Sequence, residues 1–216
     1  MENMENMALD DTAWLGMMRG KAVVAALADK GWRAVLVSDR IEAKNLLFQW
    51  LPKGVSVGLG GSQTLAAMDI LPILRSGDYH LYDRYDCPDH FKVCRDSLMA
   101  DYFITGTNAV TMDGELVNID CSGSRVAGIA YGPEHVIVVL GVNKIVDSLD
   151  EALERVRRIA PMNCRRLGHA TPCVETGICS DCNLPDRMCN QLLITLNAQK
   201  FSGKYSIIVI NEELGF

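Results

Sequence analysis

The sequence predicts a three-layer α/β sandwich with a mostly parallel sheet, because short apolar segments alternate with helical ones along the chain. Residues 135–142, HVIVVLGV, are apolar at successive positions, as expected for a strand that helices cover on both faces. A second apolar strand ends in a glycine-rich turn that leads into a helix, GLGGS, which is typical of parallel α/β folds. No repeat or linker interrupts the pattern, so we expect one domain over residues 10–216, preceded by a flexible N-terminus over residues 1–9.

The individual elements follow from apolar spacing and from residues that begin or end them. Gly31 suits the end of the first helix, Pro88 suits a first helical position, and Ser148 with Glu151 forms a capping box. Helices are expected over residues 10–30, 39–50, 62–75, 87–100, 123–131 and 148–159, and strands over residues 33–37, 55–57, 80–83, 101–106, 115–120, 135–142, 191–197 and 205–211.

Two turns and one long loop complete the expected chain path. Asp113-Gly114 and Ser202-Gly203 predict hairpins, which would add antiparallel pairs to the sheet. Residues 161–190 are rich in cysteine, proline and polar residues, and we expect a loop without secondary structure there.

Composition restricts the function classes. Apolar residues make up 49% of the 216 residues, enough for a sizeable core, and the net charge of −6 argues against a nucleic-acid partner. The longest apolar runs are far shorter than the roughly 20 residues of a bilayer span, so no membrane insertion is expected. The acidic start MENMENMALDD is unlike a secretory signal, which predicts a cytoplasmic protein.

Three polar turns follow strands that we expect in the centre of the sheet. In open α/β sheets, ligands bind beyond the carboxyl ends of the strands, and a glycine turn before a helix can hold an anion. GLGGS is neither the dinucleotide fingerprint nor the P-loop pattern, and glycine there also suits a tight turn with nothing bound. The candidate ligand residues are Gly60, Gly61, Ser62, Thr105, Gly106, Thr107, Asn108, Asn143 and Lys144, with Lys144 as the positive charge for a small anionic molecule.

The sequence contains no convincing catalytic constellation. The GxSxG nucleophile motif is absent, and the four histidines are scattered along the chain. Asp113 and Asp120 could act as acid or base, but hairpin chemistry accounts for both. The catalytic residues are therefore unknown, and whether the protein is an enzyme stays open.

Cysteines are abundant for a chain without an export signal, which favours free thiols or metal ligands over disulfides. Cys173, Cys179, Cys182 and Cys189 lie within one short segment, and the Cys179-x2-Cys182 spacing lets two thiolates bind one metal. Ordering such a long loop is costly unless something holds it. The candidates are an iron–sulfur cluster or zinc, and the alternatives are reduced structural thiols or a Cys179–Cys182 redox disulfide.

With GLGGSQTL, DYFITGTNAVTMDGELVNID and GPEHVIVVLGVNKIV in this order, the chain resembles the lactate-utilisation (LUD) domain family from about residue 10 onward. The resemblance implies a fold related to the ribose-5-phosphate isomerase, glucosamine-6-phosphate deaminase and CoA-transferase group. It also implies a place beside iron–sulfur and electron-transfer subunits in bacterial lactate oxidation. The ligand crevice of the family maps onto the three turns already named. The tail TPCVETGICSDCNLPDRMC resembles one branch of the family, and not the lactate-operon subunit itself.

The first hypothesis is therefore a LUD-type protein that binds a small anion and assists oxidation of lactate or a related organic acid. Its cysteine segment would hold a metal or iron–sulfur centre, and its partners would be electron-transfer subunits or a second copy in a homodimer. The alternatives are a stand-alone enzyme acting on a sugar phosphate or acyl-CoA, and a non-catalytic, metal-braced assembly module.

Overall fold

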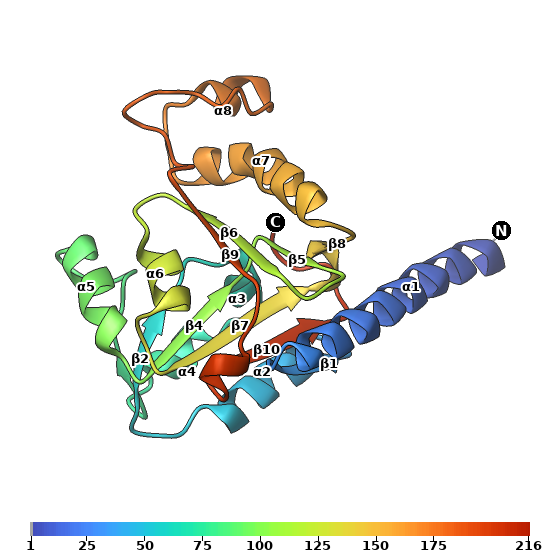
Figure 1. The fold of residues 1–216 in the computed structure, drawn as a ribbon, viewed down its shortest axis with the longest axis horizontal. Helices are drawn as coiled ribbons and strands as arrows, with labels where there is room; N and C mark the ends of the chain where they lie inside the picture. The colour runs from blue at the N-terminus through green and yellow to red at the C-terminus, as the bar shows by residue number, and fades with distance from the viewer. Residues whose placement is uncertain (1) are drawn as a thin grey trace.

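The central layer of the protein is a six-stranded parallel sheet with the order β1-β10-β7-β4-β2-β3 (Figure 1). The structure, a computed structural model, describes residues 2–216, with side chains from residue 11 onward. Met1 and the side chains of residues 2–10 lie outside this part, so the flexible N-terminus stays a prediction. The strands are β1 (Arg33–Val37), β2 (Ser56–Leu59), β3 (His80–Leu81), β4 (Tyr102–Gly106), β7 (His135–Gly141) and β10 (Tyr205–Ile210).

Helices cover both faces of this sheet, which confirms the predicted sandwich (Figure 1). The helices are α1 (Glu2–Asp29), α2 (Arg40–Trp50), α3 (Gln63–Ala67), α4 (Leu71–Arg75), α5 (His90–Asp96), α6 (Ser124–Ala130), α7 (Leu149–Arg166) and α8 (Pro172–Thr176). Three 3₁₀ turns join them: η1 (Ser97–Met99), η2 (Val142–Lys144) and η3 (Gln199–Phe201).

The central strand β7 shows why the sequence folds into layers. Its side chains alternate between the two faces: Ile137 and Val139 pack with α2, α3 and α4, whereas Val136, Val138 and Leu140 pack with α1 and α6. All five side chains are at most 1% exposed. A strand buried on both faces needs apolar residues throughout, which is the pattern that the sequence carries.

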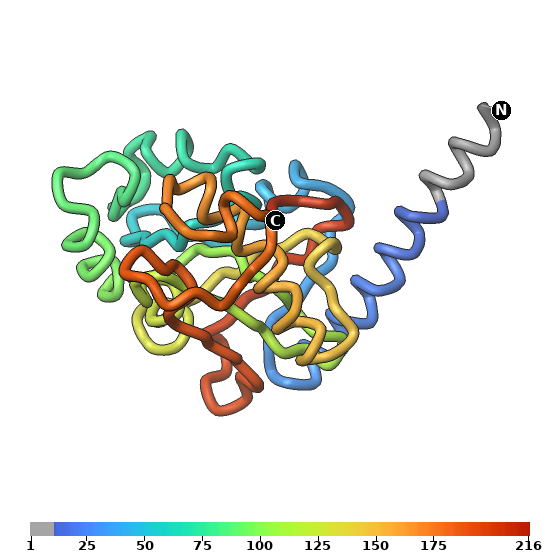
Figure 2. Tube along the Cα trace, turned by 90° about the horizontal axis from the view of Figure 1, so that it is seen from above, coloured from blue at the N-terminus to red at the C-terminus, as the bar shows by residue number. Residues whose placement is uncertain are grey.

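A second, smaller sheet lies on the α1/α6 side, in the order β8-β5-β6-β9. Its strands are β5 (Ala109–Thr111), β6 (Leu116–Asp120), β8 (Ile145–Val146) and β9 (Gln191–Thr195). The expected hairpin at Asp113-Gly114 joins β5 to β6 as an antiparallel pair. Helix α7 covers this sheet with Ala152 and Val156, and the cysteine-rich segment, orange in Figures 1 and 2, lies beyond α7 on the side away from α2.

The expected hairpin at Ser202-Gly203 is wrong. Strands β9 and β10 belong to different sheets: β9 pairs antiparallel with β6, and β10 pairs parallel with β1 and β7. The reason is burial, because β10 is apolar on both faces and fits the sheet centre, whereas the half-exposed β9 fits an edge.

The boundaries of the cysteine-rich loop also need correction. Helix α7 does not end at Ile159 but continues through Pro161 to Arg166, and residues 172–176 form α8. A proline inside a helix costs about 3 kcal/mol because one hydrogen bond is lost. Here Ile159, Ala160, Pro161 and Cys164 are all buried, so the apolar face of α7 continues past the proline and offsets that cost. None of the helices in the described residues is long and apolar enough to cross a membrane.

Candidate functional site

The sheet order brings the three predicted turns to one edge. Strands β2, β4 and β7 are neighbours and run parallel, with Leu59 beside Ile104 and Gly106 beside Val139. Because the carboxyl ends of parallel strands meet at the same edge, the turns that follow them become neighbours. The three turns therefore lie close together at the carboxyl ends of the strands, as the sequence predicts.

A cavity of about 900 Å³ opens at this edge. Its walls come from the turns after β2, β4 and β6, from α3, α4, α6 and α7, and from the cysteine-rich segment. Seven of the nine predicted ligand residues line it, namely Gly60, Gly61, Ser62, Gly106, Thr107, Asn108 and Lys144.

Thr105 and Asn143 do not line the cavity but support it. Thr105 is fully buried, and a Cβ at Gly60 would lie 2.2 Å from its Oγ1, so glycine at position 60 is required by packing. Asn143 accepts a hydrogen bond from the Leu214 amide (3.2 Å) and donates to the Gly215 carbonyl (3.4 Å). It thereby holds the last residues against the site, where Phe216 lines the cavity.

The glycine turn leaves room for a ligand, but the helix that follows it contributes little electrostatic attraction. A Cβ at Gly61 would meet nothing within 4 Å, so this position faces open space. Ser62 caps α3 by accepting from the Leu65 amide (3.3 Å), as expected for an N-cap. Because α3 has only five residues, its dipole is small, and other groups must supply most of the attraction for an anion.

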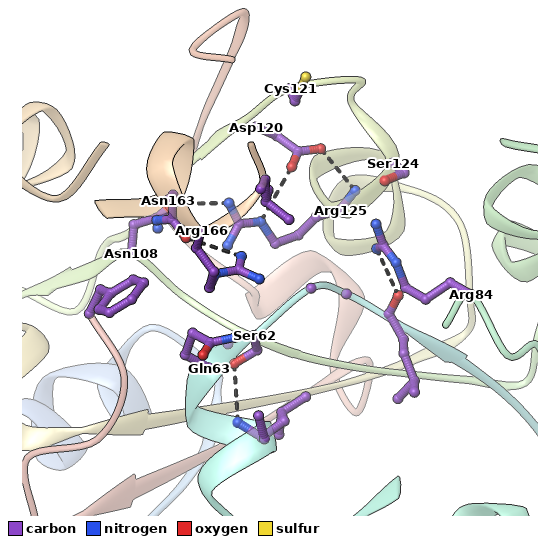
Figure 3. A pocket seen from close by; sticks show the side chains of 18 of the residues that line it. Ser62, Gln63, Arg84, Asn108, Asp120, Cys121, Ser124, Arg125, Asn163 and Arg166 are labelled. Carbon is purple, nitrogen blue, oxygen red and sulfur yellow. Dashed lines mark hydrogen bonds and ion pairs between the residues drawn. The ribbon is translucent and has the colours of Figure 1, made fainter. Parts of the chain in front are cut away.

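Those groups are cationic side chains that the sequence reading missed. Five lining side chains are cationic and two are acidic, although the whole chain carries a charge of −6. Figure 3 shows Arg84, Arg125 and Arg166 around the space above Ser62 and Gln63. The cationic lining residues are Arg75, Arg84, Arg125, Lys144 and Arg166, and the acidic ones are Asp69 and Asp120.

Arg125, at the start of α6, is held in a fixed position within this cluster. Its Nη2 donates to Asn108 Oδ1 (3.1 Å) and to the carbonyl of Ile119. Asp120 lies 3.7 Å from Nε, and both side chains are largely buried, at 13% and 15% exposure. Among the described residues Nε has no hydrogen-bond partner. Arg125 is thus a fixed cation whose charge a single carboxylate partly balances.

Arg84 and Arg166 bring further positive charge from two other elements. Arg84 donates to the Leu59 carbonyl (3.2 Å) and contacts His90 Nε2 (3.3 Å). Arg166, at the end of α7, donates to Asn163 Oδ1 (3.3 Å). The arginine ion pairs between described side chains involve Arg19, Arg40, Arg75, Arg125 and Arg187, so Arg84 and Arg166 keep their charge for a ligand.

Lys144 is the most buried of the five cationic lining residues, at 4% exposure. Its Nζ donates to Thr64 Oγ1 (2.8 Å), and the Thr64 hydroxyl donates to the Leu214 carbonyl (3.1 Å). Burial, followed by the nearby charges of Arg155 and Arg125, lowers the pKa of Lys144 to about 7.

Arg155, in α7, joins two of the site turns from behind. Its Nη1 donates to the Asn108 carbonyl (2.9 Å), while Nη2 and Nε donate to the Asn143 carbonyl (3.0 and 3.3 Å). At 5% exposure it is buried and does not line the cavity. Arg155 is therefore a positioning residue that fixes the spacing of the turns after β4 and β7.

We expect Arg155→Met to lower the free energy of unfolding by about 2–4 kcal/mol, because one buried and one half-buried carbonyl would lose their donors. Denaturant unfolding measures this loss. Arg158→Met is the matched control, since Arg158 lies on the exposed side of the same helix. Equal stability of the two variants would show that Arg155 does not hold the turns.

The cysteine-rich segment borders the cavity through Met188 and Cys189. Arg187 orders the segment by donating to the carbonyls of Cys182 and Cys189 (2.5 and 2.9 Å) and pairing with Asp181 (2.7 Å). Hydrogen bonds therefore supply part of the order that the sequence argument assigned to a metal. All eight cysteines in the described residues are free thiols.

The thiols of this segment lie close enough to perturb one another, and Cys164 from α7 joins the predicted four. Burial, with neighbouring Cys173 and Cys182, raises the pKa of Cys164, while Thr171 opposes this shift. Burial, with Cys164, Cys179 and Cys173, raises the pKa of Cys189 to about 11. Within the described residues, however, no three potential ligands are already arranged around a metal position. The thiols would have to turn toward a common point to bind one.

The fold and the cavity define an α/β protein with a central parallel sheet and a cavity at the carboxyl ends of its strands. The LUD domain family matches residues 20–210, so the chain belongs to the LUD domain family.

A solved structure supports the same fold assignment. A DUF162 family protein from Deinococcus radiodurans has 15% sequence identity and a TM-score of 0.53, and the match covers 90% of this chain and 97% of that one. Among curated proteins, none matches the chain in sequence.

Proposed function

We propose that this LUD domain protein binds a small organic anion in the 900 Å³ cavity and assists oxidation of lactate or a related organic acid. The observation that carries the proposal is the excess of cationic side chains around the cavity of an acidic protein. A partly enclosed cationic site concentrates anions and attracts them more strongly than exposed charges do. The association of the LUD family with lactate oxidation supplies the substrate class.

The size and apolar wall of the cavity refine that class. Binding sites for small molecules commonly span roughly 300–1,000 Å³, and this one is larger than lactate alone requires. Ile70, Leu71, Phe91 and Ile159 line it together with the cationic side chains. This combination favours organic acids with an apolar side chain as the related substrates, and it is less suited to a sugar phosphate.

Arg166→Gln should weaken protection by lactate against thermal unfolding, because it removes one exposed cation from the cavity. Arg165→Gln is the matched control, since Arg165 is also exposed but does not line the cavity. Both variants should unfold at the wild-type temperature without ligand. We expect about a tenfold higher lactate concentration for half-maximal protection in Arg166→Gln.

The outcome against the proposal would be equal protection of Arg165→Gln and Arg166→Gln. Protection by the neutral amide lactamide to the same extent as by lactate would also contradict it, because the negative charge would then contribute nothing.

We propose, secondly, that Cys173, Cys179, Cys182 and Cys189, joined by Cys164, hold an iron–sulfur cluster or zinc next to the cavity. The mutual pKa shifts of these thiols support it, since they indicate five thiols within one small region. A bound metal would displace the thiol protons and pull the segment together. A cluster would pass electrons to partner subunits, whereas zinc would act as a clamp.

The competing functions differ in what they require. A stand-alone enzyme needs an acid or base in the cavity, for which Asp120 is a candidate only when Arg125 does not neutralise it. A metal-braced assembly module needs the cysteines but no ligand. Cytoplasmic location and a homodimer remain predictions.

A further inference from the structure

We propose that Lys144 forms a covalent imine with the carbonyl group of a 2-oxo acid bound in the cavity. This inference rests on the proposed anion site and deepens it, because it names the class of ligand. It follows from the position and the partners of one amine.

The position of Lys144 places an amine against the cavity. The residue lies in η2, directly after the central strand β7, and its side chain lines the cavity although only 4% of it is exposed. Among the described side chains, no carboxylate lies within ion-pair distance of its Nζ. The charged groups that act on it are Arg155 from α7 and Arg125 from α6, and both are cationic. A buried ammonium in such surroundings is costly unless it loses its proton or receives an anion.

The hydrogen bonds of Lys144 leave its lone pair unused. Thr64 donates its hydroxyl hydrogen to the Leu214 carbonyl, so Thr64 Oγ1 accepts from Nζ. The neutral amine therefore donates one N–H to Thr64, and its lone pair stays available to react with another group. The pKa of about 7 means that a large fraction of Lys144 is neutral at physiological pH.

The chemical step needs no redox partner. The Nζ lone pair attacks carbon 2 of the 2-oxo acid, a C–N bond forms, and the C=O electron pair moves onto oxygen, which takes up a proton. Loss of one water from this carbinolamine gives the imine, so amine and carbonyl compound become imine and water. Arg125 and Arg166 would hold the carboxylate while Lys144 holds carbon 2.

Borohydride trapping on the wild-type protein tests this step. The protein is incubated with glyoxylate, pyruvate or phenylpyruvate, reduced with cyanoborohydride, and mapped by peptide mass spectrometry. We expect a reduced adduct at Lys144, and little at Lys53, which is exposed and paired with Asp78. At about pH 7.5 the neutral fraction of Lys144 should exceed that of an ordinary lysine by roughly a hundredfold or more. Trapping at Lys144 should level off above about pH 7, whereas trapping at Lys53 should keep rising.

The results separate this inference from the proposed function. Protection by pyruvate without an adduct at Lys144 would overturn the imine and leave the anion site standing. Neither protection nor adduct with any of the three acids would overturn both. Lys144→Arg, which retains the positive charge, should lose the adduct, and the mapping of the wild type decides the question even when this variant does not fold.

Discussion

Arg125→Gln is expected to abolish most of the affinity for organic acids and to lower the free energy of unfolding by about 2–3 kcal/mol. Arg125 donates to Asn108 and to the Ile119 carbonyl and faces Asp120. Without it, Asp120 becomes an unbalanced buried carboxylate at the cavity wall and repels the ligand. The two effects together make this the most damaging single change in the site.

Denaturant unfolding and lactate titration of the same preparation measure both losses. Arg95→Gln is the control, because Arg95 is exposed on α5 and does not line the cavity. A stable Arg125→Gln protein that binds lactate with wild-type affinity would remove Arg125 from the site. Arg125→Lys should restore charge but not the paired hydrogen bonds, and it should recover only part of the binding.

For the metal site proposed above, Cys182→Ser is expected to release the metal and to make residues 167–190 sensitive to protease. Removing one of the proposed thiolate ligands would leave the site incomplete, and the segment would then depend on Arg187 and α8 for its order. Iron, zinc and acid-labile sulfide on anaerobically purified protein give the metal content. Limited proteolysis gives the order of the segment.

The control for this change is Cys87→Ser, which alters a half-buried cysteine outside the cysteine-rich segment. Iron with matching sulfide in the wild type would favour electron transfer, and zinc alone would favour a clamp. A wild type without metal would show that the cysteines are structural thiols. Equal metal content in Cys182→Ser and Cys87→Ser would take Cys182 out of the ligand set.

The fold was largely predictable because the amino-acid composition of the central strands indicates that they are buried on both faces. Residues 136–140 of β7 are apolar at every position, and only a strand covered on both faces requires this. The pairing of β10 cannot be predicted locally, because Ser202-Gly203 resembles a hairpin turn, whereas the burial of β10 between β1 and β7 is set by distant residues. Pro161 predicts a helix end from sequence alone, because the packing that offsets its cost lies in the tertiary structure.

The only parts of the candidate site that could be predicted are the turns directly after strands. The turns after β2, β4 and β7 could be found because the topology of parallel sheets places them together. The arginines could not, since Arg84, Arg125 and Arg166 come from a loop and two helices whose mutual positions no local pattern specifies. Arg155 looks like any helix arginine until its two carbonyl partners are seen.

Calorimetric titration of the wild type and Gly61→Val tests the anion site most directly. A Cβ at position 61 would meet no atom within 4 Å, so the valine side chain should project into the cavity beside Ser62, obstruct the ligand position there and leave the fold intact. We predict saturable binding of lactate, pyruvate or phenyllactate to the wild type, none for lactamide, and none for Gly61→Val. Equal heats for lactate and lactamide, or wild-type affinity in Gly61→Val, would contradict the claim that the cationic cavity binds organic acids.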